Sequence, residues 1–238
     1  MDARTVAAAA VLSMALVVPA GCAEADTKAD TRTGGSTTTD QQSYEITEPI
    51  DALVVDARAA TVIVEGGDGP LTVDETYHFS DDKPATSHRV DGSTLHLTDS
   101  GCRNDDVRCD VEFRVHLPAA ARTEITSQAG GVRLTGLTGD VAVSTRAGAV
   151  EGRGLGSDEV NVETQAGAAR LEFAQAPSTV RASTEVGAVE VRVPDDASYA
   201  VDVQTTVGRS DVSVQRDPSS AHRIQIRTSV GAVKVAAV

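Results

Sequence analysis

The chain has 238 residues, of which 40% are hydrophobic but only 3% are aromatic, and it contains no tryptophan. Aromatic side chains usually supply much of the buried area of a globular core, so a core of Val, Ala, Leu and Thr indicates a narrow interior. The formal net charge of −14 disfavours binding to the phosphate backbone of nucleic acids. Composition therefore predicts a shallow-cored protein with no nucleic-acid partner.

The first 21 residues have the features of a lipoprotein signal peptide. Arg4 precedes an apolar run from Val6 to Val18, which is too short to span a bilayer but suits a cleavable signal. The run ends in "PAGC", which resembles a bacterial lipobox. That resemblance implies cleavage after residue 21, thioether lipidation of Cys22 and acylation of its new amine, for example with palmitate. Several acyl chains would make a stable membrane anchor. Ordinary secretion with cleavage after "AEA" at Ala23–Ala25 is the alternative.

Residues 22–43 are predicted to form a disordered polar tether. The stretch "AEADTKADTRTGGSTTTDQQS" is rich in Thr, Asp and Gly and has no apolar periodicity. About 20 flexible residues reach about 25 Å, which would lift the domain away from the membrane. An arm that pairs with the domain is the less favoured alternative, because no V-x-V pattern occurs there.

A single β domain is expected over residues 44–238, and its first part has long strands. Runs such as "PLTVDETYHFS" and "DVEFRVHLP" alternate apolar and polar residues, as strands with one buried face do. We expect a broadened N-terminal β part of the same domain. In an exported protein, Cys102 and Cys109 of "CRNDDVRC" would most simply form a disulfide. Free thiols or half of a metal site are the alternatives.

Residues 127–238 contain six copies of one motif, [S/T]-x-[A/V]-G-x-[V/A/S]. The glycines are spaced by 18, 19, 20, 21 and 23 residues, and a degenerate copy at 57–64 has Ala60 in the glycine position. The six are Gly130, Gly148, Gly167, Gly187, Gly208 and Gly231. Each repeat also holds two short β signals separated by turn clusters, and no part of the mature chain has helical periodicity. The chain is therefore predicted to be all-β.

Two all-β architectures fit these repeats. In a β-solenoid, or β-helix, of about six or seven short coils, equivalent strands stack in parallel. In an antiparallel β-sandwich or meander they would pair as hairpins. One glycine per repeat favours the solenoid, because each corner would need a positive φ or a close backbone approach at the same place. The Thr or Ser three residues before each glycine would form a hydroxyl ladder, and "TSVGAVKV" at 228–235 would be the last coil, with an unpaired edge.

Several stretches of the sequence resemble a known family. The stretches "LVVDARAATVIVEGGDG" and "FRVHLPAAARTEITSQAGGVRL", with the recurring T-x-x-G-A-V units, are similar to the bacterial putative-adhesin β-strand-repeat family, a domain of unknown function, over about residues 46–238. The resemblance implies an extracytoplasmic, often membrane-tethered β-solenoid-like domain with conjectured adhesion or scaffold roles. The commonest family unit has Asp after the glycine. This chain has Gly131, Ala149, Ala168, Ala188, Arg209 and Ala232 there.

The motifs give no support for an enzyme, a cofactor or a metal site. The five histidines lack metal-ligand spacing, "EGRGLGSD" at 151–158 is followed by no helical pattern, and no nucleophile motif occurs. Asp105 and Asp106 could offer carboxylates to a divalent cation, but a solvated acidic loop is favoured. A polysaccharide lyase on a β-helix is the less favoured enzymatic alternative.

The sequence thus predicts a lipid-anchored protein on the extracytoplasmic face of the cell membrane. Its non-catalytic β-repeat domain would act as an adhesin-like binding or scaffold module at the cell surface. Besides the membrane, an envelope protein or a wall polymer is the expected partner. The alternative is an envelope sensor or regulator that binds a protein partner by strand addition at the last coil.

Overall fold

The computed structural model describes residues 37–103 and 108–238, which contain eighteen strands. Cys22, the signal peptide, residues 22–36 of the predicted tether, and Asp105 and Asp106 lie outside these ranges. The strands are β1 (Thr38–Ile46), β2 (Ala52–Gly67), β3 (Leu71–Phe79), β4 (Thr86–Asp91), β5 (Thr94–Asp99), β6 (Cys109–Pro118), β7 (Arg122–Ala129), β8 (Val132–Thr135), β9 (Val141–Ala147), β10 (Val150–Leu155), β11 (Glu159–Ala166), β12 (Ala169–Phe173), β13 (Thr179–Val186), β14 (Val189–Val193), β15 (Ala200–Val207), β16 (Ser210–Ser213), β17 (Arg223–Val230) and β18 (Val233–Ala237).

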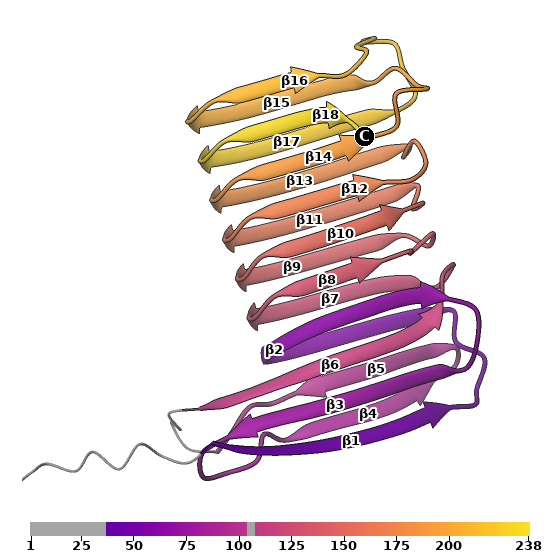
Figure 1. Ribbon diagram of the computed structural model, residues 1–238, viewed down its shortest axis with the longest axis vertical. Helices are drawn as coiled ribbons and strands as arrows, with labels where there is room; N and C mark the ends of the chain where they lie inside the picture. The colour runs from indigo at the N-terminus through magenta and orange to yellow at the C-terminus, as the bar shows by residue number, and fades with distance from the viewer. Residues whose placement is uncertain (1–36, 104–107) are drawn as a thin grey trace, which may run out of the picture. The chain divides into compact units, whose positions relative to one another are not determined.

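The strands form two facing sheets that the chain crosses in every coil (Figure 1). Sheet A has the order β1–β3–β6–β2–β8–β10–β12–β14–β18–β16. Sheet B has the order β4–β5–β2–β7–β9–β11–β13–β17–β15. The long strand β2 belongs to both, because its first half pairs with β5 and β7 and its second half with β6 and β8.

Every pairing from β2 onward along the stack is parallel, as the solenoid prediction requires. The all-β prediction is confirmed, and the antiparallel sandwich or meander is wrong for these coils. The coil number differs from the predicted six or seven. In spatial order the layers are β5/β6, β2, β7/β8, β9/β10, β11/β12, β13/β14, β17/β18 and β15/β16, which makes eight.

The last segment of the chain is not the last coil of the stack. β17 lies between β13 and β15, and β18 lies between β14 and β16. The prediction that "TSVGAVKV" leaves an unpaired edge is therefore wrong, because both strands of that segment are paired on both sides. The unpaired edges at this end belong to β15 and β16. At the N-terminal end the spatial order also departs from the chain order, because β2 lies between β5/β6 and β7/β8.

Differences in apolar content between the two final coils favour this order. Ile224 and Ile226 of β17 are fully buried, whereas Val201 and Val203 of β15 are only partly buried. Burying apolar surface stabilises by about 25 cal/mol per Å², so placing the isoleucines inside the stack gains more than placing the valines there.

A row of outward-facing charges on sheet A favours the same order. From β8 through β10, β12, β14 and β18 to β16, the row reads Arg133, Glu151, Arg170, Glu190, Lys234 and Asp211. Lys234 Nζ lies 3.6 Å from Glu190 Oε1. Stacking in chain order would set Asp211 directly beside Glu190, and like charges opposite one another are destabilising.

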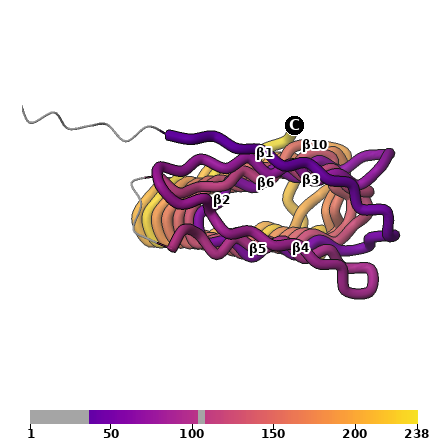
Figure 2. Tube along the Cα trace, turned by 90° about the horizontal axis from the view of Figure 1, so that it is seen from below, coloured from indigo at the N-terminus to yellow at the C-terminus, as the bar shows by residue number. Residues whose placement is uncertain are grey.

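The N-terminal end of the stack is broadened by antiparallel strands, as predicted. β1, β3 and β6 pair antiparallel in sheet A, and β4 pairs antiparallel with β5 in sheet B. Viewed along the stack, these two groups lie on opposite sides of the interior (Figure 2). The predicted tether ends earlier than residue 43, since Thr38 to Ser43 are part of β1 and pair with β3. This pairing needs only backbone groups, so it requires no V-x-V pattern.

Candidate functional site

The six repeat glycines form one column along a corner of the stack. A Cβ added to any of them would lie 1.8–1.9 Å from the carbonyl oxygen of the corner residue in the adjacent layer. For Gly148 that oxygen belongs to Gly130, and for Gly167 it belongs to Gly148. In space the column runs Ala60, Gly130, Gly148, Gly167, Gly187, Gly231 and Gly208. No side chain fits where two backbones approach this closely, which explains why the glycine recurs.

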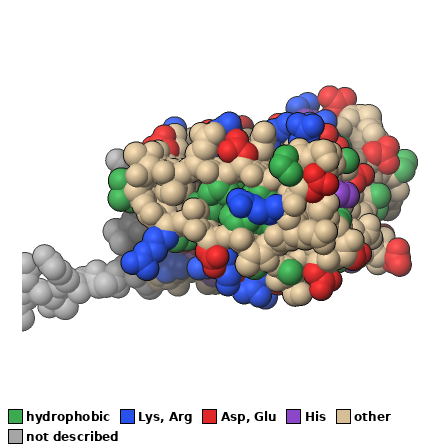
Figure 3. All heavy atoms as spheres, turned by 90° about the horizontal axis from the view of Figure 1, so that it is seen from above, with side chains coloured by type: hydrophobic (Ala, Val, Ile, Leu, Met, Phe, Trp, Pro, Cys, Tyr) green, Lys and Arg blue, Asp and Glu red, His purple; other side chains and the backbone are tan. Residues whose placement is uncertain are grey.

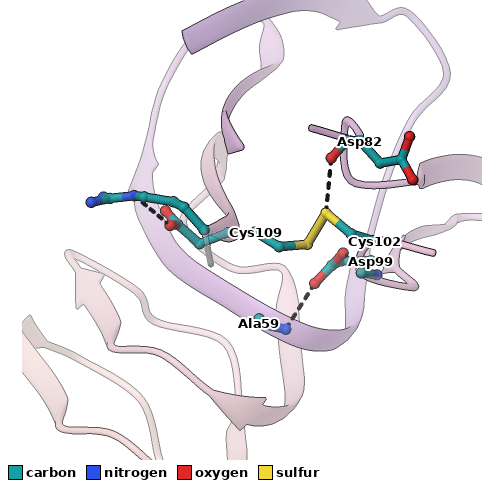
Figure 4. Close-up of a disulfide and its surroundings, with 8 residues drawn as sticks. Ala59, Asp82, Asp99, Cys102 and Cys109 are labelled. Atoms are coloured by element: carbon teal, nitrogen blue, oxygen red, sulfur yellow. Dashed lines mark hydrogen bonds and ion pairs between the residues drawn. A yellow bond between two sulfur atoms is a disulfide. The ribbon is translucent and has the colours of Figure 1, made fainter. Parts of the chain in front are cut away.

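Ala60 occupies the glycine position of β2, as the degenerate repeat predicted. Its neighbours Ala59 and Val62 pair with Ala129 and Val132 of the next layer. On the other side of Ala60 the corner is interrupted, because the chain leaves the stack between β5 and β6. The buried carboxylate of Asp99 fills this place and accepts hydrogen bonds from Ala59 N at 2.9 Å and Gly101 N at 2.7 Å (Figure 4).

The predicted hydroxyl ladder lines the inside of the same corner. Ser127, Thr145, Thr164, Thr184, Thr228 and Thr205 are in register, and all but Thr205 are buried. Thr184 donates to Gly167 O at 3.2 Å, and Thr228 donates to Gly187 O at 3.4 Å. Thr164 and Thr205 bind the glycine carbonyl of the adjacent layer in the same way, whereas Ser127 donates to Ala129 O of its own strand and the buried Thr145 hydroxyl has no partner among the described residues.

Cys102 and Cys109 form the predicted disulfide. Their Cα atoms are 6.0 Å apart, within the usual range for a disulfide. Cys102 Sγ also lies 3.0 Å from the carbonyl oxygen of Asp82, on the loop between β3 and β4 (Figure 4). The bond closes the chain between β5 and β6 at the interrupted corner, next to Asp99.

A buried polar cluster closes the interior at the N-terminal end, and the sequence analysis missed it. Glu75, only 2% exposed, accepts hydrogen bonds from Tyr44 at 2.6 Å, from Thr86 at 2.7 Å and from Tyr77. These four residues, here called the lumen cluster, join β1, β3 and β4. One signal could have revealed it: Glu75 stands in an inward-facing position of "LTVDETYHF", where Leu71 and the other alternate residues are apolar.

The environment of the lumen cluster keeps its phenols protonated. Burial, together with the hydrogen bond to Glu75, raises the pKa of Tyr77 to about 12 and raises the pKa of Tyr44 further. Lys83 Nζ lies 3.7 Å from the centre of the Tyr77 ring and 2.8 Å from Asp40 Oδ2. Hydrogen bonding to Lys83 lowers the pKa of the Asp40 carboxyl. The hydroxyls therefore remain donors to Glu75 at neutral pH, and the cluster ties three strands together.

Of the histidines in the described ranges, only His88 contacts the lumen cluster. His96 and His116 are half-buried, and His116 Nε2 lies 3.1 Å from Asp68 O. His88 stacks on Tyr44 with ring centroids 4.2 Å apart. Within residues 37–103 and 108–238, no three His, Cys, Asp or Glu side chains are grouped so as to hold a metal ion. In the same ranges no helix is long and apolar enough to cross a bilayer.

The outer face of sheet A carries a shallow groove of mixed charge. It has a volume of about 440 Å³ and is lined by three arginines, three glutamates, Gly152 and Leu171. The register of β10 against β12 shifts between Gly152 and Leu155, beside this groove. Arg170 and Arg153 lie 3.9 and 3.7 Å from Glu151, so the arginines are paired with neighbouring carboxylates.

The C-terminal end of the stack has an exposed apolar interior. We call the layer β15/β16 the open end, because its strands are unpaired on their outer side. Its inward residues Val201, Val203, Val212 and Val214 are only partly buried, and Val207 at its corner is 60% exposed. In the end view, hydrophobic side chains lie in the middle of this face with a Lys or Arg side chain across them (Figure 3).

The parallel coils and the glycine column define the chain as an all-β, solenoid-like repeat protein. The sequence profile of the Toastrack DUF4097 family matches residues 26–236, and the chain belongs to this family. This confirms the family resemblance of the repeats.

Two solved structures have a similar fold. A putative cell adhesion protein from Clostridium sporogenes superposes with a TM-score of 0.54 and 14% identity, covering 84% of this chain and 100% of its own. A putative adhesin from Bacteroides fragilis superposes with a TM-score of 0.50 and 14% identity, covering 84% and 98%. At this identity the likeness shows the fold alone. Among curated proteins, none matches the chain.

Proposed function

We propose that the protein is a membrane-anchored lipoprotein whose β-repeat domain is a non-catalytic binding or scaffold module on the extracytoplasmic face. The observation that carries the proposal is the regular stack itself, which presents rows of polar and charged side chains at a fixed spacing on two flat faces. The names of the similar structures, a cell adhesion protein and an adhesin, agree with a role at the cell surface.

The geometry suits a spacer that holds a binding surface away from its anchor. Eight layers about 4.8 Å apart give a rod about 35 Å long. The proposed lipid on Cys22 precedes β1, which lies at the N-terminal end of the rod. Within the described domain, β1 and the open end lie at opposite ends of the stack.

Replacement of Cys22 tests the anchor. The Cys22→Ala protein should leave the membrane fraction and appear in the soluble extracytoplasmic fraction, while the wild type stays with membranes. A variant that still fractionates with membranes would refute lipidation at Cys22. Labelling of the wild type, but not the variant, with a palmitate analogue is the second readout.

The binding role is tested by recovering what the protein holds in intact cells. Crosslinking followed by purification should recover either wall polymer or a stoichiometric protein partner. Wall polymer would support a surface adhesin or scaffold. A protein partner would support an envelope sensor or regulator that works by strand addition, a second candidate favoured by the unpaired edges of β15 and β16. Turnover of any uronic-acid polymer in a panel would instead support a lyase and refute the non-catalytic role.

A further inference from the structure

The two ends of the stack are built differently. At the N-terminal end, antiparallel strands widen both sheets and the lumen cluster fills the interior with hydrogen-bonded polar groups. At the open end, the last layer has the same short parallel strands as the coils beneath it, and its lumen valines are only partly covered. Repeat stacks usually need a terminal unit with a polar outer face, and the open end lacks one.

The charged residues within the two strands of the open end have one sign, whereas Arg209 at its corner and Arg216 after β16 are basic. In sheet A, the row Glu190, Lys234, Asp211 alternates and stops at Asp211 on β16. In sheet B, the row Arg181, Gln225, Asp202 stops at Asp202 on β15. These aspartates are the only charged residues within β15 and β16, and within the described residues neither has an ion pair. Edge strands are commonly protected by lysines, whereas this edge is acidic.

We propose that the open end binds an extended segment of another protein by strand addition, and that this segment carries basic residues on one face and apolar residues on the other. The inference rests on the proposed binding function and specifies its surface. The apolar residues would cover Val201, Val203 and Val212, and basic residues would lie opposite Asp202 and Asp211. Strand addition supplies main-chain hydrogen bonds for affinity, while alternate side chains give specificity.

The glycine column adds a further requirement. At each corner glycine, an added Cβ would point toward the carbonyl oxygen of the corner residue in the layer nearer the N-terminal end of the stack. At Gly208 this oxygen belongs to Gly231 and would lie 1.8 Å from the Cβ. A partner segment that continues both β15 and β16 must therefore have glycine at its corner, over Gly208. A segment that adds beside only one strand is free of this requirement.

The chain itself contains a segment that meets these conditions except opposite Asp202, where it has the neutral Gln225. Residues 223–238, "RIQIRTSVGAVKVAAV", pair with the inner side of the same two strands, with Lys234 opposite Asp211 and Val235 opposite Val212. A labelled peptide of this sequence is therefore a suitable probe of the outer side.

Binding of this peptide to the full-length chain, followed by fluorescence anisotropy, tests the proposal. The Asp202→Lys/Asp211→Lys variant should bind about tenfold more weakly, and the Asp202→Asn/Asp211→Asn variant should fall between it and the wild type. Glu48→Lys changes the net charge by +2, as the double Asn variant does, at an exposed position outside the strands, and it should bind as the wild type does. A peptide with glutamate in place of its basic residues should also bind more weakly.

Hydrogen exchange locates the bound peptide. Added protection should appear in residues 200–213, with no faster exchange in 223–237, because the peptide adds outside the native coil and does not replace it. Equal binding by the wild type and both double variants, protection elsewhere, or opening of 223–237 would overturn the proposal. Sedimentation showing that the chain alone dimerises through this edge would do the same, because the occupant would then be a second copy. None of these readouts depends on Cys22 or on adhesion, so they can fail independently of the proposed function.

Discussion

Replacing Gly167 with alanine separates the effect of close backbone approach from that of backbone conformation. The new Cβ would lie 1.9 Å from Gly148 O and 2.7 Å from Gly148 C, both backbone atoms that cannot turn aside. The adjacent layers must therefore move apart by more than 1 Å at this corner, given an ordinary contact of at least about 3 Å. Gly167 has no left-handed φ, so backbone strain does not contribute.

The expected loss of stability follows from the two backbone hydrogen bonds that flank the contact between Gly167 and Gly148. The bonds Gly148 N to Ala166 O and Val150 N to Ala168 O, at 3.0 and 2.9 Å, join the two layers on either side of it. Losing two backbone hydrogen bonds costs about 2 kcal/mol, and overpacking a close-packed site costs about 1–3 kcal/mol more. We therefore expect Gly167→Ala to lower the free energy of unfolding by about 3–5 kcal/mol, a large share of a typical 5–15 kcal/mol.

Urea denaturation with the disulfide intact measures this loss, and Gly154→Ala is the matched control. Gly154 has a φ of +61° but nothing within 4 Å of an added Cβ. Its replacement therefore costs only left-handed backbone strain, about 1 kcal/mol. If Gly167→Ala destabilises no more than Gly154→Ala, the close approach of adjacent layers is not what requires the glycines.

Four further predictions concern the two ends of the stack. Glu75→Ala leaves buried hydroxyls without an acceptor and should cost about 3 kcal/mol, with faster hydrogen exchange in β1; unchanged exchange there would contradict the role of the lumen cluster. Because the pKa of Tyr77 is raised from 10.0 to about 12, its stabilising contribution should be complete below pH 10 and be lost as the pH rises toward 12. The stability difference between wild type and Tyr77→Phe should shrink over that interval, and a constant difference would refute the shift. Replacing Cys102 and Cys109 with serine should lower the free energy of unfolding by about 2.5 kcal/mol, because the disulfide no longer restricts the unfolded chain. The loss is measured as a lower urea midpoint, and the difference between the two proteins should disappear under reducing conditions. Ending the chain after Asp217 removes an interior layer and should expose β13, β14, β15 and β16 to proteolysis, whereas a chain-order stack would lose only its last coil.

The glycine column was predictable from sequence because each close backbone approach requires a glycine at the same position of the repeat. Only glycine fits each contact, so the motif recurs even where neighbouring positions vary, and the single exception at Ala60 falls where the adjacent corner is interrupted. The disulfide was predictable for a similar reason. Cys102 and Cys109 are close in the chain and leave few other pairings.

The order of the coils was not predicted, because near-identical repeats stack almost equally well in several orders. The residues that distinguish them are few: Ile224 and Ile226 against the valines of β15, and Lys234 against Asp211. These differences favour one order only when residues at equivalent positions of adjacent layers are compared, and the order of the layers is not given by the order along the chain.

β1 and the lumen cluster were missed for different reasons. The first six residues of β1 are exposed, so pairing with β3 leaves no apolar pattern in the sequence. Glu75 lies in an apolar row next to Tyr77 on the same strand, but its other two donors, Tyr44 and Thr86, come from β1 and β4, which only the fold brings together.

Disulfide trapping tests the central claim, that the C-terminal segment is an interior layer of a parallel stack, most directly. Glu190 and Lys234 are direct partners on adjacent strands, whereas Asp211 is one layer farther from Glu190. Adjacent strands lie about 4.8 Å apart and next-but-one strands about 9.6 Å apart, while a disulfide needs Cα atoms within about 7 Å. The account predicts that Glu190→Cys forms a disulfide with Lys234→Cys and not with Asp211→Cys. Efficient trapping of Glu190→Cys with Asp211→Cys, and not with Lys234→Cys, would show that the coils stack in chain order and would contradict it.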